Sequence, residues 1–413
     1  MRGPEAIINL SHLKTNYDTV KNHLNGKRIM AVVKANGYGH GSIPCSIALE
    51  NHGCDFFGVF SIEEGIELRN AGLKSDILVF SALDPTTIND AVKNNLILNI
   101  SDKSHLDALI IFYKRKSKVP RIHIKVDTGM TRLGLEIDEF KEVLQLLIEN
   151  PEIKCEGIYS HFATADEGDL SYAFEQEKKF KFILNLADQL DYQVNDIHFS
   201  NSGAALNIDQ SYCNIIRVGM LLYGALPSNE IQTSLFVQPV MNFVAPIVSI
   251  RSVAKNTYVS YGGVYKTNSK TNIAVIQCGF ADGLPRSWFK NGYIYYNGKQ
   301  YRIAGRICMD QFMVDFGDDI PKIDDKVLII SDPMLATGSS MAMVYQALLK
   351  QGNPRKTFVV CAIAAPEALE FLQKQLPKST EYFIGAIDDE LTAQSYIVPG
   401  LGDAGDLAYG VKC

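Results

Sequence analysis

The residues best suited to chemistry lie between Ala31 and Gly41, in the run Ala-Val-Val-Lys-Ala-Asn-Gly-Tyr-Gly-His-Gly. Three small apolar residues predict the end of a buried strand, and Lys34 follows where that strand should stop. Burial against an apolar wall lowers the pKa of a lysine and favours the neutral amine that Schiff-base formation needs. The glycines suit a backbone that must approach a ligand closely. A lone lysine at a strand end more often extends into water, so other residues must support this interpretation.

Polar residues follow several other predicted strands in the same way. Taken singly, each is more often a structural polar group or a solvated charge. Hydroxyl groups, glycine amides and arginine at neighbouring strand ends suit a phosphate and a polar ring. Together with a buried lysine, they predict a phosphate-bearing aldehyde cofactor, pyridoxal phosphate. These residues are Lys125, Asp127, Arg132, His161, His198, Asn201, Ser202, Gly203, Arg217 and Tyr223.

The first part of the chain predicts a scaffold that brings such strand ends together. From Ala6 to about Leu226, short apolar runs alternate with amphipathic stretches such as Ser61–Ala71 and Ile137–Glu149. Eight such alternations predict a parallel (β/α)8 barrel, an α/β fold whose active sites gather at the carboxyl ends of the strands. An open, flavodoxin-like sheet is the alternative, but it needs fewer units. The expected strands are Arg28–Val33, Phe56–Phe60, Ile77–Val79, Ile97–Ile100, Arg121–Val126, Cys155–Tyr159, Asp196–Phe199 and Ile215–Leu222.

The pattern changes after Pro227. Apolar runs separated by short Gly and Asn turns predict a second, mostly β domain that begins near Val237. Its expected strands are Val244–Val253, Thr257–Tyr261, Asn272–Cys278, Tyr293–Tyr296, Gln300–Ile307 and Phe312–Phe316. The expected domains are therefore residues 1–236, 237–331 and 332–413.

The composition limits the classes of function. A chain of 413 residues is too long for one ordinary core. A net charge of −6 and a pI near 5.8 argue against nucleic acid or an anionic membrane as the main partner. No signal peptide is evident in Met1–Asn25, and no stretch approaches the length needed to cross a bilayer. The eight cysteines are scattered, which predicts reduced thiols in the cytoplasm rather than disulfides or a zinc site.

The stretch Val33–Gly41 resembles the pyridoxal-phosphate attachment motif of the bacterial alanine racemases. The match continues in family order to about Ile329. The family has a barrel followed by a β domain and works as a head-to-tail dimer. The resemblance therefore implies a homodimeric, pyridoxal-phosphate-dependent isomerase that acts on a small amino acid and supplies D-alanine for the cell wall. The other matching segments are Lys125–Gly134, Ser160–Asp166, Asn201–Ser202, Arg217–Gly219, Val259–Gly262, Gly279–Gly283 and Gly305–Asp310.

The resemblance implies that two residues act on opposite faces of the substrate. Lys34 would hold the cofactor and act as base on one face, and Tyr261 from the partner subunit would act on the other. Racemisation needs two such groups, because a proton leaves one side and returns from the other. The cofactor would supply the electron sink. Arg217 would contact the pyridine nitrogen and keep it unprotonated. The cofactor phosphate would be held by Tyr38, Ser202, Gly219 and Met220.

Other roles concern the substrate carboxylate. The resemblance implies that Arg132 and the Met309 backbone bind it and that His161 supports Arg217. Lys125 matches a lysine that is often carbamylated in this family, where the new negative charge orients Arg132.

Some positions have other interpretations. Without the motif, Tyr261 would be a cross-strand packing residue in a hairpin, and His161 could be a core histidine. Phe280 departs from the family, which usually has a tyrosine at this point of the substrate entrance. The departure implies altered access or looser selectivity.

The last part of the chain resembles the C-terminal part of the uracil phosphoribosyltransferases, in Asp332–Ser340, Ala364–Glu367 and Tyr396–Asp406. A Thr-Gly-Ser loop between a strand and a helix suits a phosphate, and in that family it binds phosphoribosyl pyrophosphate, with magnesium. A second glycine-rich stretch would close over uracil. The residues implied are Asp332, Ala336, Thr337, Gly338, Ser340, Ile397, Gly402 and Asp403. The expected elements are a helix at Met341–Gln351, a strand at Thr357–Ala364 and a helix at Glu367–Gln375.

The two resemblances meet in the apolar run Val327–Ile330, and neither family is complete. The closing segment of the racemases carries a tyrosine that contacts the cofactor phosphate. Tyr345 lies at a suitable distance, but its amphipathic surroundings predict packing instead. A β domain without its closing segment would leave unpaired strand edges, unless the tail covers them.

Three functions follow from these patterns. The leading hypothesis is an alanine racemase. The alternatives are transfer of a phosphoribosyl group to uracil, giving uridine monophosphate, and a non-catalytic chain. The last would be a chimera of the two families or a carrier of pyridoxal phosphate, although carriers of this barrel type lack the β domain.

Overall fold

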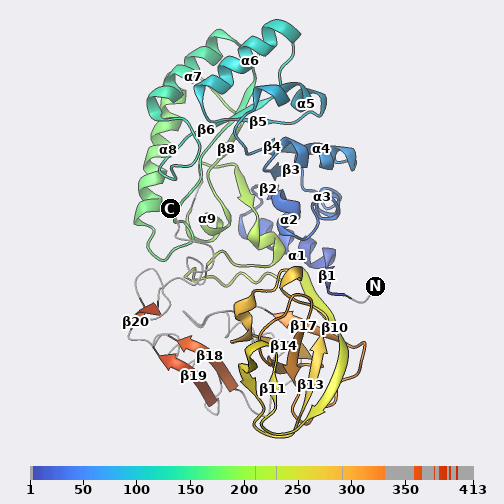
Figure 1. The fold of residues 1–413 in the computed structure, drawn as a ribbon. Helices are drawn as coiled ribbons and strands as arrows, with labels where there is room; N and C mark the ends of the chain where they lie inside the picture. Colours follow the sequence, from blue (N-terminus) through green and yellow to red (C-terminus); the bar gives the residue numbers. More distant parts are fainter. Residues whose placement is uncertain are drawn as a thin grey trace. The chain divides into compact units, whose positions relative to one another are not determined.

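The computed structural model describes residues 3–209, 211–228, 230–290 and 292–330. Beyond these it describes residue 376 and four short strands, at 358–364, 381–387, 390–391 and 397–398. It divides into two compact units, Ile8–Val240 and Met1–Ile7 with Met241–Cys413. In Figure 1 the first runs from blue to green, and the described part of the second is mainly yellow and orange.

The first unit is a closed barrel of parallel strands. They form two four-stranded sheets, ordered β4-β3-β2-β9 and β5-β6-β7-β8. The Leu78–Ile97 bridge joins β4 to β5, and the Asn214 amide donates to the Ile197 carbonyl (3.1 Å) between β8 and β9. The predicted (β/α)8 barrel is confirmed, and an open sheet is excluded. The strands are β2 (Arg28–Val32), β3 (Phe56–Val59), β4 (Asp76–Val79), β5 (Leu98–Ile100), β6 (Ile122–Lys125), β7 (Cys155–Tyr159), β8 (Asp196–His198) and β9 (Ile215–Val218).

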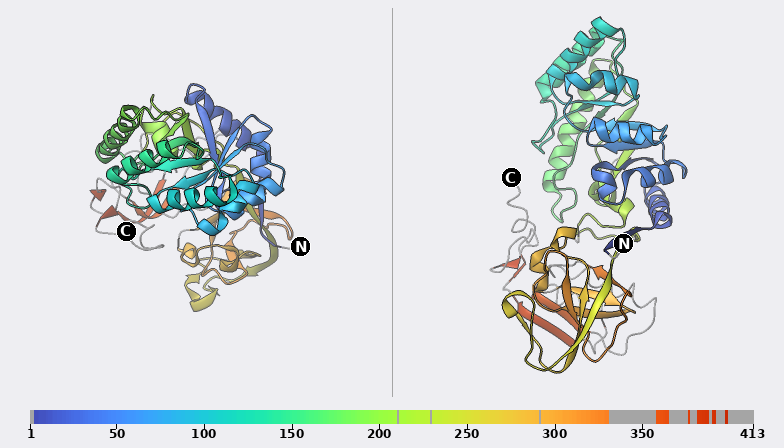
Figure 2. Two further views of the ribbon diagram at one scale, coloured as in Figure 1. Left: turned by 90° about the horizontal axis from the view of Figure 1, so that it is seen from above. Right: turned by 45° about the vertical axis from the view of Figure 1, so that its right-hand side comes forward.

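Helices surround these strands, as the left view of Figure 2 shows. The amphipathic pattern at Ile137–Glu149 forms α7 with the predicted bounds and buries Phe140, Val143, Leu144 and Leu147. β9 ends at Val218 rather than at the expected Leu222, because a 3-10 turn begins after Gly219. The helices are α1 (Leu10–His23), α2 (Lys34–Tyr38), α3 (Ser42–Glu50), α4 (Ile62–Asn70), α5 (Ile88–Lys93), α6 (Lys103–Lys116), α7 (Ile137–Glu149), α8 (Ser171–Gln189) and α9 (Ser202–Asn207), with 3-10 turns η1 (Pro85–Thr87) and η2 (Met220–Tyr223).

The second unit contains a sheet that closes on itself. Its order is β1-β10-β13-β16-β15-β14-β17, and β17 also pairs with β10. Phe243 lies opposite Ile329 in one pair, and Ile294 lies opposite the same residue in the other. The expectation of unpaired edges at the end of the β domain is wrong here, because β17 fills the gap between β10 and β14. The apolar run Val327–Ile330 therefore belongs to this closed sheet.

The expected β strands form with two main differences. The strand expected at Thr257–Tyr261 ends at Val259, because Ser260 has a φ of 66° and starts a 3-10 turn. The one expected at Gln300–Ile307 ends at Ile303, close to Gly305 with a φ of 85°. The elements are β1 (Glu5–Ile8), β10 (Met241–Val253), β11 (Tyr258–Val259), β12 (Tyr265–Lys266), β13 (Thr271–Ile276), β14 (Tyr293–Tyr296), β15 (Lys299–Ile303), β16 (Phe312–Asp315) and β17 (Lys326–Ile330), with 3-10 turns η3 (Tyr261–Gly263), η4 (Phe280–Asp282) and η5 (Arg286–Phe289).

Four short strands are described after β17. β18 (Phe358–Ala364) pairs in parallel with β19 (Glu381–Ile387), and β20 (Glu390–Leu391) pairs antiparallel with β21 (Ile397–Val398). The helices expected at 341–351 and 367–375 lie outside the described residues. In the part of the chain that the structure describes, no helix is long and apolar enough to cross a membrane.

Candidate active site

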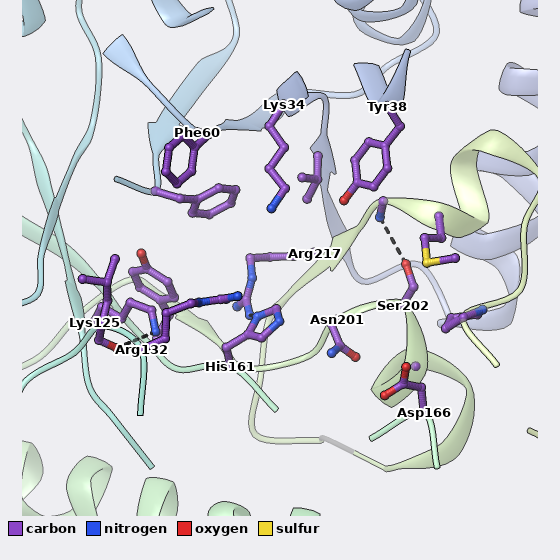
Figure 3. A pocket seen from close by; sticks show the side chains of 18 residues that line it. Lys34, Tyr38, Phe60, Lys125, Arg132, His161, Asp166, Asn201, Ser202 and Arg217 are labelled. Atoms are coloured by element: carbon purple, nitrogen blue, oxygen red, sulfur yellow. Dashed lines mark hydrogen bonds between the residues drawn. The ribbon is translucent and has the colours of Figure 1, made fainter. Parts of the chain in front are cut away.

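A cavity of about 530 Å³ opens at the carboxyl ends of the barrel strands. Figure 3 shows the Lys34 amine and the Tyr38 hydroxyl pointing into it, with Arg217 and His161 opposite and Ser202 at one end. The structure thus brings most of the expected site residues together. Those that line the cavity are Lys34, Tyr38, Lys125, Arg132, His161, Ser202, Arg217, Gly219 and Met220.

Lys34 follows one residue after β2, which ends at Val32 rather than at the expected Val33. Burial lowers the pKa of its amine, and the cationic Arg132 and Arg217 lower it further, while the Glu64 carboxylate opposes them. A depressed pKa increases the fraction of neutral amine, which is the nucleophilic and basic form. The geometry therefore suits this lysine to bond with an aldehyde and to accept a proton.

The Arg217 guanidinium lies buried among neutral acceptors. It donates to Nδ1 of His198 (3.0 Å), to Nδ1 of His161 (3.0 Å) and to the Ser160 carbonyl (2.8 Å). Burial, with the nearby arginines, holds the pKa values of both imidazoles well below their ordinary range, so they remain neutral acceptors. Burial also lowers the pKa of Arg217, to about 10, which leaves it charged at neutral pH. The chain thus presents a fixed cation to the cavity.

A set of small donors lies at the other end of the cavity. The Gly219 amide donates to the Ser202 hydroxyl (3.1 Å), and burial raises the pKa of Tyr38, which keeps its phenol protonated. A Cβ on Gly219 would lie only 2.5 Å from the Tyr38 oxygen, so glycine is required for this close approach. The hydroxyl and amide donors at this end suit a phosphate, the Lys34 amine suits an aldehyde, and the Arg217 guanidinium suits a ring nitrogen. Together they fit a phosphorylated pyridine aldehyde. The residues present therefore fit pyridoxal phosphate.

Lys125 and Arg132 lie at the opposite end of the cavity from Tyr38 and Ser202 (Figure 3). The Lys125 amine donates to the Leu133 carbonyl (2.8 Å). Burial, followed by Arg217 and Arg132, lowers the pKa of Lys125 to about 8. The lowered pKa leaves roughly a tenth of the molecules with a neutral Lys125 amine at pH 7.

Tyr261 and Met309 lie in the second unit and are not among the residues that line the cavity. Tyr261 is 67% exposed in the turn η3, so it is not the cross-strand packing residue of the alternative interpretation. The turn is held where the Ser260 hydroxyl donates to the Arg306 carbonyl (2.6 Å). Met309 is also exposed. Its carbonyl accepts a bond from Ala281 (3.0 Å), and within the described part of the chain its amide has no acceptor.

Sequence reasoning did not identify the apolar walls of the cavity. Phe60 and Phe80 come directly after β3 and β4, and Tyr159 ends β7. Their position at strand ends was the available signal, but they look like ordinary core residues. Asp166 stands inside a matched segment without an assigned role, whereas Asn201 and Gly203 line the cavity as members of the predicted polar group. The lining residues that the sequence does not assign are Val32, Phe60, Phe80, Leu133, Tyr159, Asp166 and Pro227.

The site expected in the last part of the chain cannot be placed in the same way. Asp332, Ala336, Thr337, Gly338, Ser340, Gly402 and Asp403 lie outside the described residues, as does Tyr345. Ile397 begins the short strand β21, of which the backbone alone is described. No cluster of metal-ligating side chains occurs among the described residues. Binding of magnesium, phosphoribosyl pyrophosphate or uracil stays a prediction from the sequence.

Comparison with known families covers nearly the whole chain. The model of the alanine racemase N-terminal domain matches residues 8–227, and that of the alanine racemase C-terminal domain matches residues 240–350. The uracil phosphoribosyltransferase model matches residues 313–411 and overlaps the racemase match over 313–350. The racemase similarity therefore extends past Leu328, where its recognisable motifs stop.

Individual relatives agree. The alanine racemase of Desulforamulus reducens is 37% identical over 329 residues, which are 78% of this chain and 89% of that protein. The solved alanine racemase of Clostridium difficile 630 has a TM-score of 0.75 and 32% identity, over 84% of this chain and 92% of that one. The structure from Bartonella henselae, which carries covalently bound pyridoxal phosphate, has a TM-score of 0.73 and 26% identity, over 86% and 98%. The chain belongs to the alanine racemase family.

Proposed function

We propose that this chain interconverts L-alanine and D-alanine with pyridoxal phosphate and so supplies D-alanine for peptidoglycan. The observation that carries the proposal is the Lys34 amine, whose pKa burial lowers and which faces a cavity whose donors suit the cofactor. Family membership supports the reaction, since the matched relatives are named as alanine racemases.

The cofactor, when bound, draws electron density from the α-carbon and so makes its proton removable. Lys34 would bond to its aldehyde carbon. Tyr38, Ser202, Gly219 and Met220 would hold its phosphate.

The Arg217 cation would face the ring nitrogen and keep that nitrogen free of a proton. The neutral His161 and His198 fix the guanidinium plane by accepting two of its hydrogen bonds. With the cofactor bound, Arg217 held in this way would moderate carbanion stabilisation and so favour simple proton exchange over side reactions.

Two groups would exchange the α-proton from opposite faces. Lys34 would take or give it on one face, and Tyr261 from a partner subunit would do so on the other. The exposure of Tyr261 in its own unit supports a shared site in a homodimer. Neither group alone can racemise, because a single base returns the proton to the side from which it came.

Substrate alignment would depend on the carboxylate. Arg132 and the Met309 amide would bind it. The neutral Lys125 amine would react with carbon dioxide, forming an N–C bond and releasing one proton. The resulting carbamate anion would orient Arg132 by charge.

The test is D-alanine formation from L-alanine by the purified chain with added pyridoxal phosphate, with Lys34→Ala as the blank. We expect D-alanine from the original chain and none above background from the variant. Absence of D-alanine from protein that has bound the cofactor would contradict the proposal.

A further inference from the structure

Glu64, in the first turn of α4, binds the backbone directly after Lys34. Its Oε1 accepts a 2.7 Å hydrogen bond from the Ala35 amide, and its Oε2 accepts one of 2.7 Å from the Phe60 amide. Ala35 follows the lysine at the end of β2, and Phe60 follows β3 and lines the cavity. One carboxylate therefore links the lysine's backbone to the neighbouring wall of the cavity.

The two amides are those that a longer β ladder would use. β2 and β3 run parallel, and the Val33 amide donates to the Gly58 carbonyl (2.9 Å). In a parallel ladder continued by two residues, the Phe60 amide would donate to the Val33 carbonyl and the Ala35 amide to the Phe60 carbonyl. Neither of these bonds forms.

Both backbone acceptors are occupied by other donors. The Val33 carbonyl accepts from the Gly37 amide, and the Phe60 carbonyl accepts from the Ser81 amide, each at 2.9 Å. The two carboxylate oxygens of Glu64 accept from the Ala35 and Phe60 amides in place of these two carbonyls. Without its carboxylate, these two exposed amides would bond only to water and would no longer be tied to one another.

The chain leaves β2 through a left-handed turn that needs such support. Ala35, Asn36 and Gly37 have φ values of 53°, 54° and 61°. A left-handed conformation is strained for a residue that has a Cβ. At the far end, the Asn36 side chain accepts from the Ser42 amide (3.0 Å), and at the near end Glu64 holds Ala35. The turn is thus held by side chains at both ends.

Glu64 also places a negative charge near the lysine. Arg132 and Arg217 are the cations that act on the Lys34 amine, and Glu64 is the anion that opposes them. Glu64 does not itself line the cavity. Its influence on the amine therefore passes through the backbone and through charge.

We propose that Glu64 is a positioning residue for Lys34, which fixes the start of the left-handed turn against the Phe60 wall so that the amine points into the cavity. This inference rests on the proposed role of Lys34 in racemisation. It assigns Glu64 no contact with substrate or cofactor.

The test compares Glu64→Ala and Glu64→Gln with Glu63→Gln in the full chain. Glu63 is the matched control, because it lies in the same first turn, is exposed and makes no hydrogen bond to Ala35 or Phe60. Two readouts are needed. One is kcat and KM for L-alanine with added cofactor, and the other is hydrogen–deuterium exchange of the Ala35 and Phe60 amides without cofactor.

For Glu64→Ala we expect kcat to fall roughly 10- to 100-fold, because the amine is displaced, with KM changed by less than about threefold. Exchange at the Ala35 and Phe60 amides should accelerate. Glu64→Gln should be intermediate in both readouts, because its side chain keeps one acceptor oxygen. Glu63→Gln should match the original chain.

Equal kcat and equal exchange in Glu64→Ala and Glu63→Gln would overturn the inference. If Glu64→Ala does not fold, Glu64→Gln against Glu63→Gln decides the question by the same criteria. If the original chain makes no D-alanine, the proposed function fails separately. The exchange of the two amides then decides whether Glu64 holds the turn.

Discussion

The two units of this chain present their expected reacting groups in opposite environments. In the barrel, Lys34 lies in a cavity where burial and two guanidinium groups lower its pKa. In the β unit, Tyr261 is mostly exposed on a turn. Residues of its own unit enclose Lys34, whereas Tyr261 is largely uncovered within its own unit. The proposed site, shared between two copies of the chain, would need such an exposed group from the partner.

The largest expected effect tests the exposed half of this comparison. Tyr261→Phe removes one hydroxyl, and we expect racemisation to slow roughly 10²- to 10⁴-fold, because one of the two acid–base groups is lost. Cofactor binding should not change. Tyr258→Phe is the matched control, since Tyr258 is equally exposed in the same hairpin. Equal turnover by the two variants would remove Tyr261 from the mechanism.

The donors around Ser202 and Gly219 in the barrel cavity are tested by the affinity for the cofactor. A Cβ on Gly219 would lie 2.5 Å from the Tyr38 hydroxyl. We expect Gly219→Ala to weaken pyridoxal-phosphate binding roughly 10- to 100-fold, as crowding in a packed site commonly costs 1–3 kcal/mol. Titration of the protein with cofactor measures this. In the double variant Gly219→Ala, Tyr38→Phe, the loss of cofactor-binding free energy should be smaller than the sum of the losses in the two single variants. Losses that simply add would contradict the contact between these residues.

The free energy of unfolding tests whether burial of the Lys125 amine destabilises the barrel. Its pKa is about 8 in the folded chain and 10.5 in an ordinary environment, so the unfolded chain binds more protons between these values. Its burial therefore destabilises the fold fully below pH 8, and the penalty disappears as the pH rises toward 10.5. We expect Lys125→Met to raise the free energy of unfolding by about 1–2 kcal/mol at pH 7 in solution freed of carbon dioxide. Urea unfolding at pH 7 and pH 10 should show that gain shrinking, and a constant gain would refute it.

The smallest expected effect returns to the β unit. Because the Tyr261 side chain is mostly exposed, Tyr261→Ala should change the free energy of unfolding by no more than about 0.5 kcal/mol. Thermal or urea unfolding measures it. A large loss would mean that this tyrosine packs within its own chain, and the contrast with Lys34 would no longer hold.

The sequence predicts the barrel well because its signal is repeated. Each small apolar run followed by a polar residue marks a strand end, and eight such runs favour a closed barrel over an open sheet. The sequence therefore predicts that Lys34, Arg217 and Ser202 lie at one edge of the barrel. The strand β17 was harder, since an apolar run such as Val327–Ile330 does not reveal which strands lie beside it.

The walls of the cavity depend on packing that a linear pattern does not encode. Phe80 lies where a Cβ on Gly58 would come within 2.5 Å of its ring, so a glycine on one strand makes room for an aromatic residue from the next. Similarly, Ser61 and Glu64 form an ordinary capping box by sequence spacing. Only the fold brings that glutamate to the backbone of Lys34.

The most direct test of the shared site is complementation between two inactive variants. Lys34→Ala lacks one reacting group and Tyr261→Phe lacks the other, so neither should racemise alanine alone. If each site takes Lys34 from one subunit and Tyr261 from the other, a mixed dimer contains one complete site. We predict that differently tagged variants, coexpressed and purified as the mixed dimer, regain D-alanine formation. A mixed dimer that stays inactive while binding pyridoxal phosphate would contradict the account.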